Sequence, residues 1–400
     1  MALGRPFWTF WTAAVLVNLG DGIRLAAFPL LAASLSSDPL AVGAVAAAGT
    51  LPWLLTGPVA GVLADRHGTR RLLPLADAGR AVVLLALVAL IVAGQASVPV
   101  VAVAAFLLGV GETVRDVAAE TVVPRLVPAA LLERANGRLM AGTVIGNEFV
   151  GPLAGGVLFA VGVALPFLVN GATTALAVLL VLWLPAALLT ALTPAAGPVP
   201  AGRGVRAGLR WLARDRPLRT LALTVAAIAL ADSAWFAVFV LYAEQRLGLG
   251  PAGFGTLLAM GAGGGLAGAL LADRLVAGRR HRVVITGSAL LATVPPCLLV
   301  ATGELWAARV VVVATSAAFG MLNVAAASLR HRGIPTHLLG RVTATWRTGV
   351  YGAGAAGALL GGLLASTAGL DTPFVVSGAV GTAATAAWWL ASGPRQRPAG

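Results

Sequence analysis

Long apolar stretches, each separated from the next by a short polar break, run through the whole 400-residue chain. About 20 apolar residues form a helix long enough to cross the roughly 30 Å hydrocarbon core of a bilayer. The sequence therefore predicts an all-α membrane protein. The expected transmembrane helices are residues 7–33, 39–64, 72–94, 98–121, 140–162, 166–190, 219–243, 253–277, 282–302, 305–328, 341–366 and 371–391.

Charge is scarce and unevenly placed. Only 11% of the residues are charged, whereas soluble domains carry about 25%. Most arginines fall in alternate breaks, starting with the segment before the first span, so the positive-inside rule predicts that both termini are cytoplasmic. An even number of spans requires the same. The net charge of +13 does not predict nucleic-acid binding, because the arginines are spread over these loops and not gathered on one face.

The longest break, residues 193–218, divides the chain into two parts, 1–192 and 219–400. It begins with Pro and Gly and continues as a basic amphipathic segment, which predicts a linker with a helix on the cytoplasmic membrane surface. The two parts resemble each other in four ordered matches: "LGDGIRLAAF" (19–28) with "LADSAWFAVF" (230–239), "GVLADRHGTRR" (61–71) with "GALLADRLVAGRR" (268–280), "GPLAGG" (151–156) with "GALLGG" (357–362), and "PFLVNGA" (166–172) with "PFVVSGA" (373–379). We expect two pseudo-symmetric six-helix bundles with a substrate site between them near mid-membrane.

The loop "GVLADRHGTRR" (61–71) between the second and third spans resembles the loop signature of the major facilitator superfamily. Every position of that signature is matched, by Gly61, Asp65, Arg66, Gly68, Arg70 and Arg71. The resemblance implies the major facilitator fold, with this loop stabilising one conformation of the transport cycle. It also implies that an acidic residue at the cytoplasmic end of the fourth helix, here Glu120, pairs with the basic residues of the loop.

The fifth span contains "GPLAGG", which is similar to the antiporter motif associated with proton-coupled exporters of the same family. The matching residues are Gly151, Pro152, Gly155 and Gly156, while Asn147 replaces an upstream glycine of the motif. Glycines allow close helix packing and the proline bends the helix. "VVPRLVPAALLERANG" (122–137) and "NLGDGI" (18–23) resemble a bacterial subfamily of enterobactin-exporter-like and drug-efflux transporters.

Several ionisable residues lie inside the predicted spans, where each costs about 2.5–3.5 kcal/mol at a helix centre unless it faces a cavity or a partner. One interpretation is proton coupling, since a buried acid without a cation binds a proton more readily. The alternative is a closed structural network: Asp21 with Arg24, Glu112 and Asp116 with Arg115, and Asp77 with Arg80. The candidates for proton coupling or mid-membrane charge are Asp21, Arg24, Glu112, Arg115, Asp116, Glu148, Asp232 and Arg347.

Asp232 differs from the other acids because its own span supplies no cation. We expect it to pair with Arg347 or to contact a cationic substrate. Aromatic and amide side chains in the spans predict an aromatic substrate cavity. Its candidate lining residues are Asn147, Trp235, Phe236, Phe239, Asn323, Trp346 and Tyr351.

Together these features predict a secondary active transporter that exports a drug, siderophore or secondary metabolite by alternating access, coupled to protons. The alternatives are an importer, either symporter or uniporter, and a receptor or scaffold that does not transport. Enzyme signatures are absent, and the four histidines lack metal-ligand spacing. We expect a monomer in the cell membrane without cofactor, catalytic residues or metal, with a small molecule, protons and lipid as its partners and no nucleic acid.

Overall fold

The computed structural model describes residues 3–56, 60, 63, 68–185, 201–276 and 281–392, and this part of the chain is helical, without strands. Eleven of its helical segments are long and apolar enough to cross a membrane. The apolar helix α2 (Pro39–Leu55) is shorter, and much of the rest of the predicted span 39–64 lies outside the described residues. The expectation of an all-α membrane protein is confirmed.

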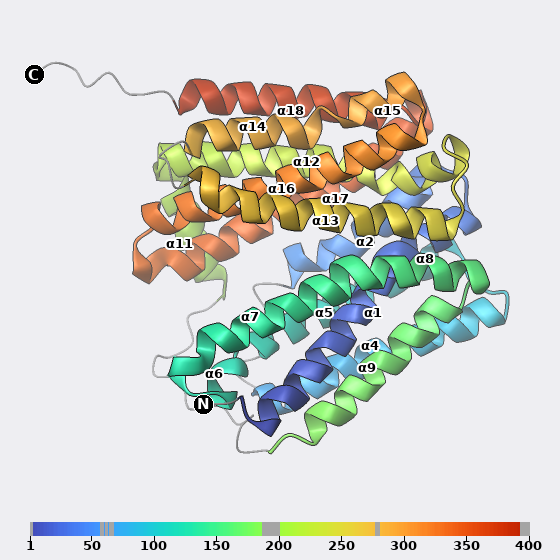
Figure 1. The fold of residues 1–400 in the computed structure, drawn as a ribbon, viewed down its shortest axis with the longest axis vertical. Helices are drawn as coiled ribbons and strands as arrows, with labels where there is room; N and C mark the ends of the chain where they lie inside the picture. The colour runs from blue at the N-terminus through green and yellow to red at the C-terminus, as the bar shows by residue number, and fades with distance from the viewer. Residues whose placement is uncertain are drawn as a thin grey trace, which may run out of the picture.

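The helices form two groups that follow the order of the chain (Figure 1). The first group contains α1 (Arg5–Leu35), α2, α4 (Thr69–Val92), α5 (Val98–Glu120), the short α6 (Val123–Leu126) and η1 (Ala129–Leu131), a continuous run of α7 (Leu132–Thr143), η2 (Val144–Val150) and α8 (Gly151–Val161), and α9 (Leu165–Leu182). The second contains α12 (Arg216–Gln245), α13 (Pro251–Val276), α14 (His281–Thr293), α15 (Pro296–Thr302), α16 (Leu305–Gly333), α17 (Thr336–Ala368) and α18 (Thr372–Ala391).

Prolines and caps determine where several helices begin. Pro39 stands at the first turn of α2, where no amide donor is needed, and the Asp38 carboxylate accepts a hydrogen bond from the Leu40 amide at 3.0 Å. Asp215 caps α12 in the same way through the Leu218 amide at 2.9 Å. These caps satisfy amide groups that would otherwise lack partners where the chain turns between spans.

The fifth transmembrane segment contains a π-helical stretch, η2, directly before α8. Pro152 follows it, and a proline inside a helix lacks an amide donor and clashes with the carbonyl four residues earlier, which is that of Glu148. Widening the helix locally accommodates that clash. The segment therefore crosses the membrane region as α7, η2 and α8 with a change of helical phase in its middle.

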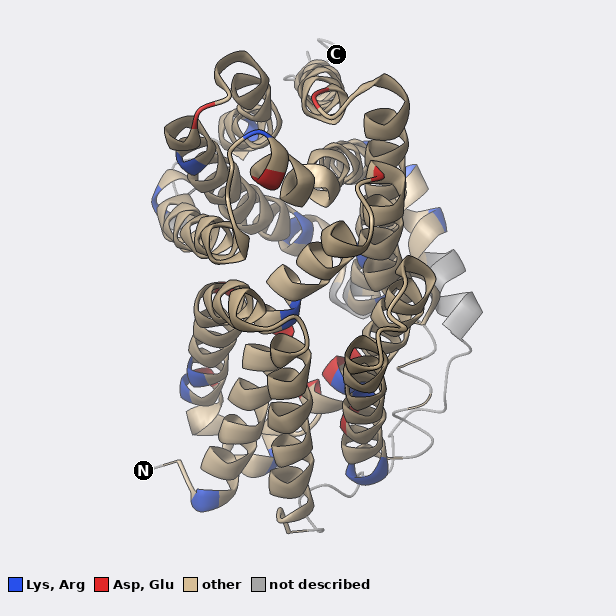
Figure 2. Ribbon diagram, turned by 90° about the vertical axis from the view of Figure 1, so that its right-hand side faces the viewer, with Lys and Arg blue, Asp and Glu red and all other residues tan. Residues whose placement is uncertain are grey.

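Each group is held together by its own helix pairs: α1 packs on α9 and α4 on α5 in the first, and α13 packs on α16 and α12 on α17 and α18 in the second. The two most extensive contacts between the groups are α2 with α17 and α8 with α13. Charged positions are sparse along all of these helices (Figure 2). Apolar packing between helices therefore supplies most of the contact surface.

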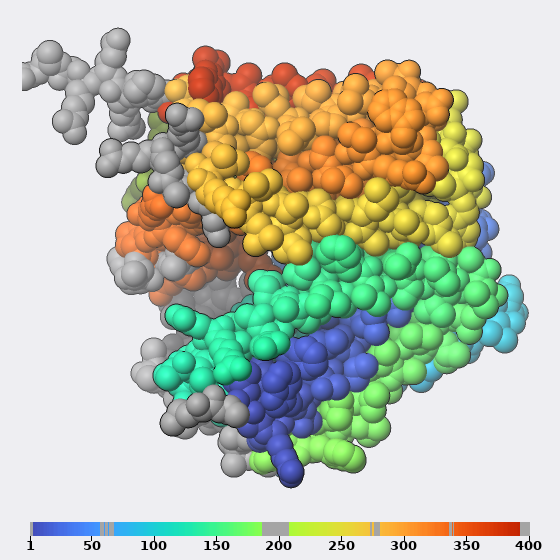
Figure 3. All heavy atoms as spheres, in the orientation of Figure 1, coloured from blue at the N-terminus to red at the C-terminus, as the bar shows by residue number. Residues whose placement is uncertain are grey.

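Glycines bring the two groups together at both joining contacts. A Cβ atom on Gly43 of α2 would lie 2.6 Å from the carbonyl oxygen of Ala358 and 3.0 Å from the Cα of Gly362 on α17. A Cβ atom on Gly156 of α8 would lie 3.0 Å from the Cα of Gly255 on α13. Only glycine permits such backbone approach between membrane helices. Space-filling atoms show the groups in contact along α8 and α13, with a recess between α7 and the second group at the end that carries α11 (Figure 3).

Helix α11 (Ala201–Arg214) confirms the predicted helix in the second part of the linker. It packs against α17 and α12, and Leu212 is buried with residues of the second group. A Cβ atom on Gly208 would lie 2.6 Å from the carbonyl oxygen of Arg341, so the contact with α17 is close. The helix is therefore docked on the second group, and its location at the cytoplasmic membrane surface stays a prediction. Residues 193–200 lie outside the described part of the chain.

Candidate transport site

A cavity of about 370 Å³ lies between the two groups of helices. Helices α1, α2, α5 and η2 line it from the first group, and α12, α13 and α17 line it from the second. Among the described residues, its charged and amide side chains come from the first group; they are Asp21, Arg24, Glu112, Asn147 and Glu148. Aromatic side chains come from both groups; they are Phe28, Trp53, Phe236, Phe254 and Tyr351.

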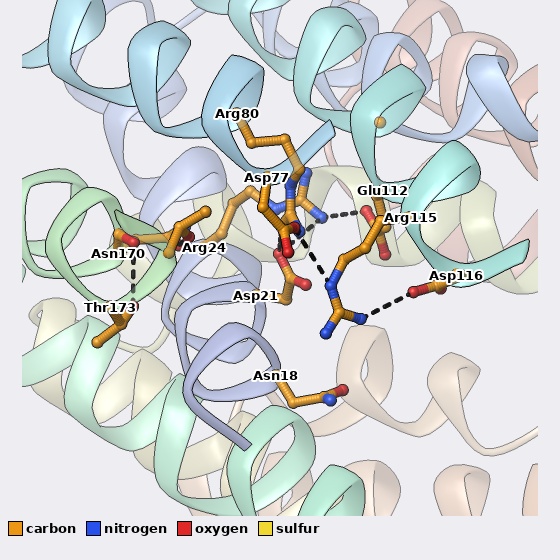
Figure 4. Close-up of polar contacts among 12 residues, drawn as sticks. Asn18, Asp21, Arg24, Asp77, Arg80, Glu112, Arg115, Asp116, Asn170 and Thr173 are labelled. Carbon is orange, nitrogen blue, oxygen red and sulfur yellow. Dashed lines mark hydrogen bonds and ion pairs between the residues drawn. The ribbon is translucent and has the colours of Figure 1, made fainter. Parts of the chain in front are cut away.

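Asp21 connects three helices through arginines (Figure 4). Its carboxylate accepts a hydrogen bond from Arg80 of α4 and lies 3.6 Å from the Arg24 guanidinium one turn along α1. Arg24 in turn donates a hydrogen bond to Glu112 of α5. Burying an unpaired charge costs roughly several kcal/mol. These pairs therefore favour the one arrangement of α1, α4 and α5 in which every partner is in reach.

The network continues around Asp77, which is 1% exposed. The Arg115 Nε atom lies 3.2 Å from an Asp77 oxygen, and the Arg80 Nη1 atom lies 3.5 Å from the same oxygen. Arg115 also contacts Asp116 at 3.3 Å. We call the seven residues Asp21, Arg24, Asp77, Arg80, Glu112, Arg115 and Asp116 the charge network.

The charge network has one more acid than it has arginines. Asp116 is the least compensated acid, because its side chain is 41% exposed and its one recorded cation, Arg115, also serves Asp77. Glu112 pairs with Arg24, which it shares only with the more distant Asp21. The surplus negative charge therefore resides at the Asp116 end of the network.

The closed-network interpretation was correct for the pairs Asp21–Arg24, Asp77–Arg80 and Arg115–Asp116. It was wrong for Glu112, whose partner is Arg24 and not the Arg115 of its own helix. Sequence reasoning also missed the two pairs that join α4 to its neighbours, Arg80–Asp21 and Arg115–Asp77. The spacing of Asp77 and Arg80, three residues apart on one helix face, indicated only the pair within α4 and gave no signal for the two pairs between helices.

Asp232 lies on α12 next to Ser233, a cavity-lining residue. Among the described residues, no ion pair is recorded for Asp232, so the structure does not contain the expected pair with Arg347. The Arg347 guanidinium instead lies over the Trp53 ring, 5.0 Å from its centre. Trp53 stacks on Tyr351 with their ring centres 4.9 Å apart, which joins α2 to α17.

Three of the predicted cavity residues, Asn147, Phe236 and Tyr351, line the cavity. The structure places the other four elsewhere. Trp235 and Phe239 are buried in the core, with ring centres 5.3 Å apart, and Trp346 is buried beneath Arg330. Asn323 is exposed on α16. Phe28, Trp53 and Phe254 were missed, because the sequence does not tell which aromatic of a uniformly apolar span faces the cavity.

Only part of the signature loop is described. Gly61, Asp65 and Arg66 lie outside the described residues. Gly68 precedes α4 with a φ of 72°, a backbone conformation that favours glycine.

The other described members of the predicted latch are exposed. Arg70, Arg71 and Glu120 are all exposed, and no ion pair of Glu120 is recorded in the described part of the chain. A hydrogen bond of 2.7 Å between the hydroxyls of Thr69 and Thr121 joins α4 to the end of α5. The pairing of Glu120 with the loop therefore stays a prediction.

The antiporter-like motif packs on the segment of α1 that carries Asp21 and Arg24. A Cβ atom on Gly151 would lie 2.5 Å from the Cα of Gly22, and one on Gly155 would lie 2.4 Å from the carbonyl oxygen of Ile23. Pro152 is buried between them, and Gly156 faces α13 as described above. The motif thus fixes the distance between α8 and the charged part of α1.

Two helical groups in a membrane, closing around a cavity whose lining both supply, define a membrane transporter. The family model described as Major Facilitator Superfamily matches residues 10–357. The chain belongs to the major facilitator superfamily, as the sequence predicted.

Relatives and solved structures agree with this assignment. The chain is 31% identical over 383 residues to the multidrug efflux pump Tap of Mycobacterium tuberculosis, covering 92% of this chain and 89% of the relative. It is 30% identical to Tap of Mycolicibacterium fortuitum, covering 91% and 90%. The fold is similar to the nucleoside transporter NupG (TM-score 0.79, 11% identity, 97% and 100% coverage) and to a bacterial homologue of the iron transporter ferroportin in an inward-facing state (TM-score 0.77, 18% identity, 98% and 100% coverage).

Proposed function

We propose that the protein exports small organic compounds across the cell membrane and that protons moving in the opposite direction drive the export. The observation that carries this proposal is the contact between the cavity and the charge network, since Asp21, Arg24 and Glu112 belong to both. A bound compound and a change of protonation would therefore act on the same side chains.

Export, as opposed to uptake, is supported by two observations. The relatives that match nearly the whole chain are named multidrug efflux pumps. The antiporter-like glycines of α8 pack on the segment of α1 that carries Asp21. The protein would move its substrate by alternating access, with residues 1–192 and 219–400 as the two moving bundles, residues 193–218 as the linker and both termini in the cytoplasm. We propose a monomer as the transport unit, because both groups of helices that line the cavity belong to one chain.

The proton step follows from the ion pairs. Protonation of Glu112 would remove the negative partner of Arg24, and Arg24 would then retain only Asp21, at 3.6 Å. Protonation of Asp116 would leave the remaining acids and arginines of the charge network equal in number. Either event changes the electrostatic attraction between α5 and its neighbours α1 and α4. That change would shift the balance between conformations in which the cavity opens to opposite sides.

The test is uptake of candidate compounds into proteoliposomes under an imposed pH gradient. We expect the gradient to stimulate uptake by the parent protein, and we expect Glu112→Gln and Asp116→Asn to lose the stimulation. Glu133→Gln is the matched control, because Glu133 is exposed on α7 and is not among the residues that line the cavity. Proton coupling is wrong if the flux ignores the gradient in the parent and in both variants. If only a pH gradient of the opposite sign stimulates uptake of the compound, the protein is an importer.

A further inference from the structure

We propose that the cavity selects amphipathic organic cations and that Glu148 is the residue that selects them. This inference rests on the proposed transport function and specifies its substrate class. It starts from the charges that line the cavity. Asp21, Glu112 and Glu148 are acidic, and Arg24 is the one basic residue among the described lining side chains.

The charges of the lining are not equally available to a ligand. Arg24 is engaged by Asp21 and by Glu112, so its positive charge is already compensated. Glu148 has no ion pair among the described residues, and its side chain is exposed where it borders the cavity. An anionic ligand would meet this uncompensated carboxylate, whereas a cationic ligand would supply its missing partner.

Glu148 occupies the π-helical segment η2 between two packed neighbours. The backbone of Asn147 lies against α1, since a Cβ atom on Gly22 would be 2.5 Å from the Asn147 carbonyl oxygen. Phe149 lies against α13, since a Cβ atom on Gly263 would be 3.5 Å from its ring. Glu148 is therefore held at the junction of the two helical groups. Single π-helical turns of this kind occur often at functional sites.

The rest of the lining suits the apolar part of such a cation. Phe28, Phe236 and Phe254 come from three different helices, and the stacked pair of Trp53 and Tyr351 adds a further aromatic wall. Aromatic faces attract cations as well as apolar groups. The volume of about 370 Å³ falls within the range of roughly 300–1,000 Å³ for sites that bind drug-sized molecules.

Arg347 contacts Trp53, a residue of the cavity wall, and is a basic residue that could oppose this selection. It is not among the residues that line the cavity, and its guanidinium lies over the Trp53 ring, 5.0 Å from the ring centre. Arg80 is buried and hydrogen-bonded to Asp21. In the part of the chain that the structure describes, neither of these arginines forms an ion pair with Glu148.

The experiment compares two ions of the same shape and opposite charge, tetraphenylphosphonium and tetraphenylborate. Their binding to the purified full-length protein in lipid nanodiscs is measured by equilibrium dialysis at constant pH, with empty nanodiscs subtracted. We expect the parent to bind the cation at least tenfold more tightly than the anion. Glu148→Gln should lower cation affinity at least tenfold and leave anion affinity unchanged or higher, and Glu148→Asp should keep most of the cation preference.

The matched control is Glu244→Gln, which removes the same charge from an exposed position of α12 outside the cavity lining and should bind both ions like the parent. The inference is overturned if the parent binds both ions equally or if Glu148→Gln keeps the parent's preference. Binding at constant pH needs no proton gradient. A protein that selects the cation but shows no gradient-driven flux would contradict the proposed coupling alone, and one with normal flux but no charge preference would contradict this inference alone.

Discussion

Arg80 of α4 donates a hydrogen bond to the carboxylate of Asp21 on α1, and both side chains are buried. The same guanidinium lies 3.5 Å from Asp77 of its own helix. One arginine thus compensates two acids from two helices. In an apolar interior this makes Arg80 the residue on which the arrangement of α1 and α4 depends most.

Replacing Arg80 with methionine should lower the free energy of unfolding by about 3–5 kcal/mol, because a buried acid loses its partner. Thermal unfolding in detergent measures the loss. Adding Asp21→Asn to Arg80→Met should restore part of the stability, since no unpaired Asp21 charge then remains. Equal stability of the single and double variants would contradict the proposed dependence. Arg70→Met, at an exposed position of the same helix, is the control.

The two acids that share Arg115 should respond differently to neutralisation. Asp77 is 1% exposed and contacts two arginines, so Asp77→Asn leaves buried positive charge and should cost about 3–5 kcal/mol. Asp116 carries the surplus charge and is 41% exposed, so Asp116→Asn should change stability by less than about 1 kcal/mol. Unfolding midpoints of the two variants under one set of conditions decide the matter. A larger loss of stability for Asp116→Asn than for Asp77→Asn would show that the surplus negative charge lies elsewhere in the charge network.

The substitution Gly255→Leu should prevent α8 and α13 from packing against each other. A Cβ atom there would lie 2.5 Å from the carbonyl oxygen of Pro152, and backbone cannot yield as a flexible side chain can. We expect Gly255→Leu to abolish flux and to raise labelling of Ser233→Cys, a cavity position, by an impermeant thiol reagent added from the side opposite α11.

Two features make the labelling of Gly255→Leu interpretable. The background is Cys297→Ser, which removes the natural thiol. Gly79→Leu is the control, because nothing lies within 4 Å of a Cβ atom at Gly79. Unchanged labelling with full flux in Gly255→Leu would mean that this glycine contact does not close the cavity.

The stack of Trp53 on Tyr351 should contribute to ligand binding, because it forms cavity wall and joins the two groups of helices. Such an aromatic pair contributes about 0.5–1.5 kcal/mol beyond the area it buries. Trp53→Ala should therefore weaken tetraphenylphosphonium binding severalfold, while Trp53→Phe should keep most of the affinity. Dissociation constants of the three proteins test this, and equal values would place the ligand away from the stack.

The sequence was sufficient for the membrane class, the helix spans and the family. Apolar length decides whether a helix can cross a bilayer, and the motif at 61–71 is contiguous, so neither depends on tertiary structure. The glycines of "GPLAGG" were also interpretable, because close packing is their one physical advantage there. Their partners on α1 and α13 became known only from the structure.

The charge network was less predictable because its pairs cross helices. Spacing along one helix identifies partners such as Asp77 and Arg80. It cannot assign Arg24 to Glu112, 88 residues away. The prediction of the aromatic lining was wrong in part for a related reason. Trp235 and Phe236 are adjacent, yet Trp235 is buried in the core and Phe236 borders the cavity. In helices that are apolar all round, hydrophobic periodicity does not report which face is inward.

The charged residues of the cavity wall are unequally divided between the two groups of helices, and this affects how the transporter can change by substitution. Among the described lining residues, the first group of helices supplies every charged one, and the second supplies neutral wall from α12, α13 and α17. Substitutions on that neutral wall can reshape what the protein recognises without disturbing the pairs among α1, α4 and α5. The charged part of the cavity wall and the neutral part that is free to diversify are thus located in different halves of the chain.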